Sequence, residues 1–190
     1  MALTTRNAWS VGPIVNGKNS SKGFTVLPTP AGALFAFQFP GPTGKAGYIT
    51  KRGSSLTGKS LIRLKLRIEG SGTFDAAGSD VPPCHFRPYF QRSGDDWQGT
   101  TNKTEFYRWW CNSRVTPITF GSFSVEAPLD PAQWGSVFAK TGVQAGKKWT
   151  AALANCGTIG FTLGGRSFAG HGVMMASGSA KLILESFEVI

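Results

Sequence analysis

Acidic residues are scarce in this sequence and absent from its first third. Ten Asp or Glu stand against twenty Lys or Arg, a net charge of +10, and the first acid is Glu69. A region that carries only positive charge attracts nucleic acid, anionic polysaccharide or an acidic protein. Residues spread over several strands would equally give a diffuse solubilising charge, so both interpretations of residues 1–68 stay open. The basic residues there are Arg6, Lys18, Lys22, Lys45, Lys51, Arg52, Lys59, Arg63, Lys65 and Arg67.

The shortage of acids and of histidine limits the catalytic arrangements that the chain can build. Glycosidases need two carboxylates about 5 to 9.5 Å apart across a cleft. The obvious pair, Asp95 and Asp96, is adjacent in a Ser-Gly-Asp-Asp run that is typical of a turn. His85 and His171 cannot form a multi-histidine metal site, although oxygen ligands in a loop could hold a structural calcium. We therefore predict a protein that is not an enzyme and has no cofactor beyond such a calcium.

The three cysteines, Cys84, Cys111 and Cys156, are an odd number without C-x-x-C spacing. This pattern predicts neither a disulfide framework nor a zinc site, and indicates small buried hydrophobic side chains.

Export and membrane signals are also missing from the sequence. The start, MALTTRNAWSVG, has no basic segment followed by an apolar one, and no apolar run reaches the roughly eighteen residues of a membrane span. We expect synthesis in the cytoplasm without a signal peptide, no membrane partner, and a place on a virion or outside the cell after lysis.

A phosphate-binding motif occurs in an unsuitable context. GSSLTGKS, residues 53–60, fits G-x-x-x-x-G-K-[ST], which needs a strand before the loop and a helix after it. Here the loop leads into LIRLKLRIE, whose period of two is that of a strand. The segment is therefore interpreted as a Gly/Ser turn.

The abundant residue types favour short strands and tight turns. The chain has 25 Gly, 11 Pro, 14 Phe and 6 Trp. In LIRLKLRIEG, apolar residues from Ile62 to Ile68 alternate with Arg63, Lys65 and Arg67, as in a half-buried strand. GALFAFQFPG, TPITFGSFSV, TIGFTLGG and KLILESFEVI predict further strands. We predict one all-β domain over residues 1–190, folded as a two-sheet antiparallel jelly-roll sandwich.

One or two short helices are expected between the strands. In PLDPAQWGSVFAKTG, Asp130 is placed to cap a helix, Pro131 to begin it and Gly142 to follow its end. Trp134 and Phe138 would then lie on one helical face. KKWTAALANCG predicts one or two further turns.

The segments HFRPYFQRSGDDW and TEFYRWWCN predict two strands joined by a loop. Side chains two apart share a strand face, so one side carries Arg87, Tyr89 and Gln91, and the other Phe86, Pro88 and Phe90. Aromatic rings stack on the apolar faces of sugars, while Arg and Gln reach their hydroxyls. The alternative is that most of these rings are core. The candidate ligand-binding residues are Arg87, Tyr89, Gln91, Trp97, Arg108, Trp110 and His171.

Two features of this candidate site stay undecided. Arg108 and Trp110 share one strand face while Trp109 lies on the other, and periodicity does not decide which Trp is core. The glycine-rich residues 160–180 are expected to place His171 in a hairpin loop, where it is a candidate if that loop covers the same face.

The order of FRPYFQRSGDDW, YRWW, PLDPAQW, IGFTLGG, GHGV and GSAKLILESFEVI resembles the galactose-binding-like jelly rolls found as carbohydrate-binding modules and in phage and bacterial surface proteins. The resemblance covers roughly residues 60–190. It implies two antiparallel sheets face to face, often a structural calcium, and sugar bound on the concave face or in loops by the candidate residues named above. The acid-free first third and the lack of a secretion signal or attached enzyme depart from that family.

These departures favour a virion context. The leading hypothesis is a non-enzymatic binding protein on a phage-like particle that contacts surface carbohydrate. The alternative is a structural virion protein, such as a capsid decoration or tail component, which would use the same surface for contacts with other virion proteins or in a homo-oligomer.

Overall fold

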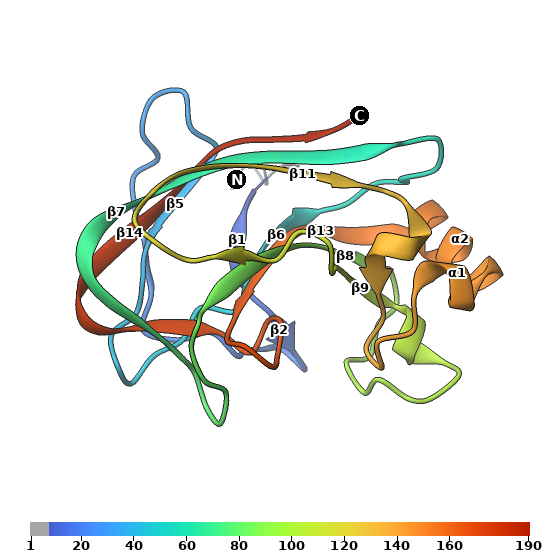
Figure 1. The fold of residues 1–190 in the computed structure, drawn as a ribbon, viewed down its shortest axis with the longest axis horizontal. Coiled ribbons are helices and arrows are strands. Elements are labelled where there is room, and N and C mark those ends of the chain that lie inside the picture. The colour runs from blue at the N-terminus through green and yellow to red at the C-terminus, as the bar shows by residue number, and fades with distance from the viewer. Residues whose placement is uncertain (1–7) are drawn as a thin grey trace.

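The computed structural model describes residues 8–190 and consists almost entirely of β-strands in two facing antiparallel sheets (Figure 1). The predicted all-β sandwich is therefore confirmed. The seven-stranded sheet has the order β1 (Ser10–Gly12), β6 (Tyr48–Arg52), β13 (Cys156–Gly164), β8 (His85–Arg92), β9 (Arg108–Cys111) and β12 (Trp134–Gly135), with β10 (Thr116–Pro117) also paired to β8. The five-stranded sheet has the order β11 (Gly121–Pro128), β7 (Leu61–Ala76), β14 (Val173–Val189), β5 (Phe35–Gln38) and β4 (Thr25–Val26). A small pair is formed by β2 (Ile14–Val15) and β3 (Lys18–Asn19).

Alternating burial in β7 follows the pattern in its sequence. Ile62, Leu64, Leu66 and Ile68 are buried in the core between the sheets, as expected of a strand with one apolar side. The long strands β7 and β14 pair with each other along nearly their whole lengths and curve together (Figure 1).

A bulge keeps β14 in phase with the core. Leu182 and Leu184 face the core, and the pairing with β7 then shifts between Leu184 and Ser186. The extra residue allows Phe187 to point into the same core, which strict alternation would have prevented.

The basic side of β7 is largely matched by acids on its neighbouring strands. Arg63 Nε lies 2.7 Å from Glu126 Oε1, and its Nη1 lies 3.3 Å from Glu188 Oε2. Arg67 pairs with Glu69 and, at 3.1 Å, with Glu185. Acids from later in the sequence thus meet the basic strand across the sheet, and an anionic partner of residues 1–68 stays a prediction.

Helices cover one end of the sandwich, beside β8 and β9 (Figure 1). They are the 3-10 turns η1 (Thr104–Phe106) and η2 (Pro131–Gln133) and the helices α1 (Gly142–Ala145) and α2 (Lys147–Ala154). In α2, Trp149 packs against Trp109 and Phe90, with ring centroids 4.8 and 5.4 Å apart. The one or two turns predicted for KKWTAALANCG are confirmed.

The helix predicted from Asp130 to Gly142 is wrong beyond its first turn. Asp130 does cap, accepting the N–H of Ala132 at 2.9 Å, but the turn ends at Gln133. Trp134 then pairs with Cys111 in strand β12 and is fully buried, while Phe138 is exposed. Strand pairing and burial of the Trp134 ring outweigh the local helical signal, and Gly142 begins α1 instead of ending a helix.

Other expectations concern single segments. Residues 53–60 form a turn between β6 and β7, with no helix after it, as predicted. Cys84, Cys111 and Cys156 are buried and free. No helix within residues 8–190 is long and apolar enough to cross a membrane.

Candidate functional site

The candidate residues lie on the outer face of the seven-stranded sheet, the face turned away from the core. In β8, Phe86 and Phe90 enter the core, so Arg87, Tyr89 and Gln91 point outward. Tyr89 pairs with Trp110 and Gln91 pairs with Arg108 on the neighbouring strand β9. This register decides which tryptophan of β9 faces the core, which periodicity alone left open.

Trp109 is the core residue of β9, and Trp110 belongs to the outer face. Trp109 is fully buried and donates its indole N–H to the carbonyl of Phe106 at 2.8 Å. Arg108 and Trp110 are half-buried on the opposite side. The outer face therefore carries both a guanidinium group and an indole from β9.

Tyr89 and Gln91 form the floor of this face. The Tyr89 ring is fully buried and lies 5.1 Å from the Tyr48 ring and 5.4 Å from the Trp110 ring, between centroids. Its hydroxyl donates to Gln91 Oε1 at 3.0 Å, and burial raises the pKa of Tyr89 above its usual range. Both side chains support the residues above them from buried positions.

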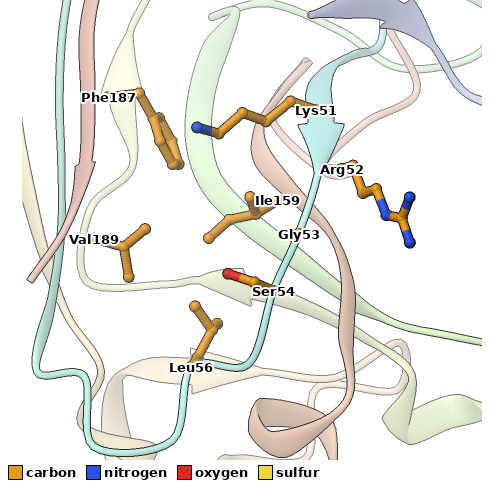
Figure 2. A pocket seen from close by; sticks show the side chains of 8 residues that line it. All are labelled: Lys51, Arg52, Gly53, Ser54, Leu56, Ile159, Phe187 and Val189. Atoms are coloured by element: carbon orange, nitrogen blue, oxygen red, sulfur yellow. The ribbon is translucent and has the colours of Figure 1, made fainter. Parts of the chain in front are cut away.

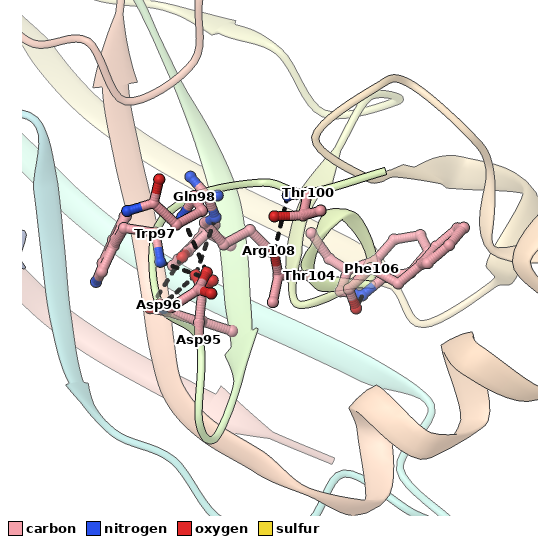
Figure 3. Close-up of polar contacts among 11 residues, drawn as sticks. Asp95, Asp96, Trp97, Gln98, Thr100, Thr104, Phe106 and Arg108 are labelled. Atoms are coloured by element: carbon pink, nitrogen blue, oxygen red, sulfur yellow. Dashed lines mark hydrogen bonds and ion pairs between the residues drawn. The ribbon is translucent and has the colours of Figure 1, made fainter. Parts of the chain in front are cut away.

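The loop after β8 folds back over the outer face and is held by Asp95. Its Oδ1 accepts the backbone N–H of Trp97 at 3.1 Å (Figure 3). Its Oδ2 accepts from Gln91 Nε2 at 2.8 Å. Oδ2 also lies 2.9 Å from Arg108 Nε, an ion pair without hydrogen-bond alignment. Burial raises the pKa of Asp95, opposed by Arg108 and the two donors.

Trp97 covers the Arg108 side chain from the loop. The guanidinium carbon of Arg108 lies 5.1 Å from the Trp97 ring centroid, a cation–π contact. The same ring meets Tyr48 edge-on at 5.5 Å. Trp97 has a φ of 64°, a conformation that the Asp95 contacts hold in place.

A second loop, residues 165–172, covers the other side of the outer face. It connects β13 of one sheet to β14 of the other, so the predicted hairpin is wrong: the two strands do not pair with each other. His171 stacks on Phe168 with 4.6 Å between ring centroids. His171 does lie over the predicted face, because its loop crosses from sheet to sheet above it.

Asp80 anchors this second loop. Its carboxylate accepts the backbone N–H groups of Gly165 at 2.9 Å, Ser167 at 3.0 Å and Phe168 at 3.2 Å, and that of Val81 at 2.9 Å. Burial alone would raise the pKa of Asp80, but these donors bring it below its usual range.

The second loop, residues 135–139 and the outer face of the sheet line a cavity of about 270 Å³, called here the Arg87 cavity. It brings together four candidate residues, Arg87, Arg108, Trp110 and His171. Tyr89, Gln91 and Trp97 are not in its wall. The remaining lining residues are Tyr48, Asn112, Gly135, Ser136, Val137, Ala139, Ser167, Phe168 and Ala169.

Two further cavities adjoin the Arg87 cavity along the outer face. One, of about 350 Å³, shares Tyr48, Arg108 and His171 with it and adds Trp97. The next, of about 280 Å³, is lined by Tyr48, Trp97 and Gln91 among others. Tyr48 belongs to all three, so the outer face carries a continuous row of hollows with rings between them.

Several buried polar atoms in the Arg87 cavity wall have no hydrogen-bond partner within residues 8–190. They are Arg87 Nε, Arg108 Nε, Trp110 Nε1 and Ser136 Oγ. The guanidinium of Arg87 donates from Nη1 to Asn112 Oδ1 at 3.3 Å, and burial lowers the pKa of Arg87. Buried polar groups are normally paired, so the polar groups of this wall are incompletely satisfied by the protein, although these four atoms lie beneath its surface.

A structural calcium stays a prediction, and no cluster of acidic side chains within residues 8–190 marks a place for it. These residues contain no group of three or more His, Cys, Asp or Glu that could hold a metal ion. Asp80, the buried acid of the second loop, already accepts four backbone N–H groups.

A separate cavity of about 540 Å³ opens between β6 and β14, away from the candidate residues (Figure 2). Leu56, Ile159, Phe187 and Val189 give it apolar walls, and the ammonium group of Lys51 points over the Phe187 ring at 5.4 Å (Figure 2). Burial lowers the pKa of Lys51. None of the predicted site residues lines this cavity.

Sequence reasoning missed several lining residues of the outer face. The sequence could have indicated Tyr48, since it alternates with the core residue Ile49 in GYITK and so points to the outer face. It gives no such indication for Ser136 and Asn112, because their positions depend on how β12 pairs with β9.

No family model and no curated protein matches the chain. Among solved structures, a native family 12 xyloglucanase from Bacillus licheniformis aligns with 96% of this chain and 99% of its own. The identity is 10% and the TM-score is 0.27. A likeness of this size carries no argument about sites or substrates.

One expectation is nevertheless corrected by this comparison. The chain was expected not to be an enzyme, and the solved structure of similar extent is an enzyme. The expectation of a non-enzymatic protein is therefore withdrawn, and the outer face is interpreted as a binding site.

Proposed function

We propose that the outer face of the seven-stranded sheet binds carbohydrate, with one sugar unit in the Arg87 cavity. The observation that carries the proposal is the meeting of Arg87, Arg108, Trp110 and His171 around one hollow with rings and unpartnered polar atoms in its wall. Sugar sites combine aromatic surfaces with a few placed polar groups.

Each lining group has a role in this proposal. Trp110 and the exposed Phe168 ring provide apolar surface for a sugar face, and Arg87 provides polar contacts to its oxygens. Asp95 positions Arg108, and Asp80 positions the loop that carries His171. The adjoining hollows would take further units of an oligosaccharide, with Tyr48 and Trp97 beside them.

A glycan array followed by titration tests this function. We expect array hits whose binding changes tryptophan fluorescence, and Trp110→Ala should weaken binding at least about tenfold, the loss of one stacked ring and its N–H. Phe138→Ala is the matched control, because this exposed ring lies outside the cavity wall. An array without hits, or equal effects of both variants, would refute the proposal.

We propose separately that the protein displays this face on the surface of a phage-like particle. Detection of the protein in purified virions by mass spectrometry, with antibody access to the outer face, would support it. The structural alternative predicts a defined oligomer in light scattering that hides the same face, and a monomer at micromolar concentration would count against it.

A further inference from the structure

The wall of the Arg87 cavity carries cationic donors and, within the described residues, no anionic acceptor. Among the residues that the structure describes, no Asp or Glu lines it, while Arg87, Arg108 and the indole N–H of Trp110 do. Asp95, the acid paired with Arg108, is not part of the wall. A ligand that fits this wall must bring acceptor oxygens.

Arg87 differs from Arg108 in having no carboxylate partner within residues 8–190. Its hydrogen bond to Asn112 uses Nη1. Its Nε is buried out of a ligand's reach, whereas no partner within residues 8–190 takes its Nη2. The edge formed by Nη1 and Nη2 can bind a carboxylate through two parallel N–H···O bonds.

We infer that the Arg87 cavity binds the carboxylate of an acidic sugar, such as a uronic or sialic acid. The inference rests on the proposed carbohydrate function and names its ligand class. The carboxylate accepts from the Nη groups of Arg87, with the Arg108 side chain and the Trp110 ring beside it in the same wall.

A neutral sugar is a poorer match for this wall. Its hydroxyls donate as well as accept, and sites for neutral sugars commonly include a carboxylate as acceptor. The acceptors of this wall are neutral groups, such as the Ser167 hydroxyl and Asn112 Oδ1, and Asn112 Oδ1 already accepts from Arg87. An unpaired guanidinium in a partly buried site is also costly, and a bound anion offsets that cost.

Burial supports the same assignment. It lowers the pKa of Arg87, opposed only by the charge of Asp80, whose oxygens are taken by backbone N–H groups. The cation is thus poorly solvated within the protein, a condition under which an ion pair with a ligand is strong.

The test is an array of matched glycan pairs, each acidic glycan printed beside its carboxyl-reduced form and beside a sulfated neutral glycan. We expect binding to acidic members at least about tenfold tighter than to reduced members, as for a hydrogen-bonded charge pair. For the best pair, titration should show that Arg87→Gln weakens binding of the acidic glycan about 10- to 100-fold and hardly changes binding of the reduced one.

Two variants make the result specific. Arg166→Gln removes one positive charge from the exposed loop outside the cavity wall and should leave affinity nearly unchanged. Arg87→Lys keeps the charge but lacks the two-donor edge, and should recover only part of the affinity. Circular dichroism and thermal unfolding confirm that each variant is folded.

The outcomes separate the two proposals. Equal binding of acidic and reduced members overturns the carboxylate assignment and leaves carbohydrate binding intact. Equal or better binding of sulfated members, or equal losses in Arg87→Gln and Arg166→Gln, also overturns it, since both indicate general attraction of anions. No binding to any member refutes the carbohydrate function itself.

Discussion

Arg108 Nε and Asp95 Oδ2 lie 2.9 Å apart in a pair whose side chains are 11% and 1% exposed. The pair joins the loop after β8, which carries Asp95, to strand β9, which carries Arg108 on the outer face. Burial raises the pKa of Asp95 despite this neighbour, so desolvation outweighs the attraction between the two groups. The pair is therefore important for positioning the loop and contributes little net stability.

Removing one partner of this pair should cost more than removing both. Asp95→Asn turns an NH₂ group toward the Gln91 amide and the Arg108 guanidinium, which leaves buried donors unpaired, and we expect a loss of about 1–3 kcal/mol in the free energy of unfolding. The double variant Asp95→Asn/Arg108→Gln should be closer to the wild type. Urea unfolding of Asp95→Asn, of Arg108→Gln and of the double variant measures the coupling.

Asp96→Asn is the matched control for that cycle. Asp96 is exposed and accepts one backbone N–H, from Gln98 at 2.9 Å, so its loss should cost less than about 1 kcal/mol. If the double variant Asp95→Asn/Arg108→Gln loses as much stability as the two single variants together, Asp95 and Arg108 act independently.

His85 gives the protein a pH-dependent stability. Burial, and then the charge of Arg87, lower its pKa to about 4 from an ordinary value of 6.5. Between these pH values the unfolded chain binds a proton that the folded chain does not. Acid therefore favours unfolding, and stability that is fully present above pH 6.5 falls by about 1.4 kcal/mol per pH unit toward pH 4.

His85→Gln checks this directly. The variant removes the titrating group, so its free energy of unfolding should fall less steeply than that of the wild type between pH 6.5 and pH 4. Urea unfolding across this window gives both slopes. Identical slopes would mean that His85 is protonated equally in the folded and unfolded states.

The strands were predictable where burial alternates strictly. Ile62 and Arg63 lie on opposite sides of β7, as the alternation of apolar and basic residues in the sequence predicts. The core role of Trp109 was not predictable, because Trp110 beside it is equally aromatic. The pairing of Tyr89 with Trp110 decides it, and pairing is a relation between distant segments.

The site shows the same division. The outward positions of Arg87 and Trp110 follow from periodicity together with one pairing register. The position of His171 depends on a loop that crosses between the sheets. The burial of Tyr89 depends on the Tyr48 ring, which packs against it from a distant strand. Trp134 left its expected helix because capping residues specify only the first turn, and tertiary packing decides the rest.

Asp80 should control the order of the loop over the Arg87 cavity. Asp80→Asn replaces one acceptor oxygen by an NH₂ group that faces backbone donors, and we expect a loss of about 1–3 kcal/mol. The backbone amides of Gly165, Ser167 and Phe168 should exchange hydrogen faster. Asp75→Asn, at an acid that accepts one N–H from Ala76, is the control and should leave these amides unchanged.

Trp149 should be the main attachment of α2 to the sandwich. A helix of eight residues is too short to be stable alone, so its order depends on packing. The Trp149 ring is buried against Trp109 and Phe90, and Trp149→Ala should cost about 3–5 kcal/mol. Thr150→Ala, at the next and exposed position, should change stability by less than about 1 kcal/mol. Urea unfolding compares the two. A cost below about 1 kcal/mol for Trp149→Ala would mean that the aromatic core closes without the helix, and that α2 is held by its backbone connections instead.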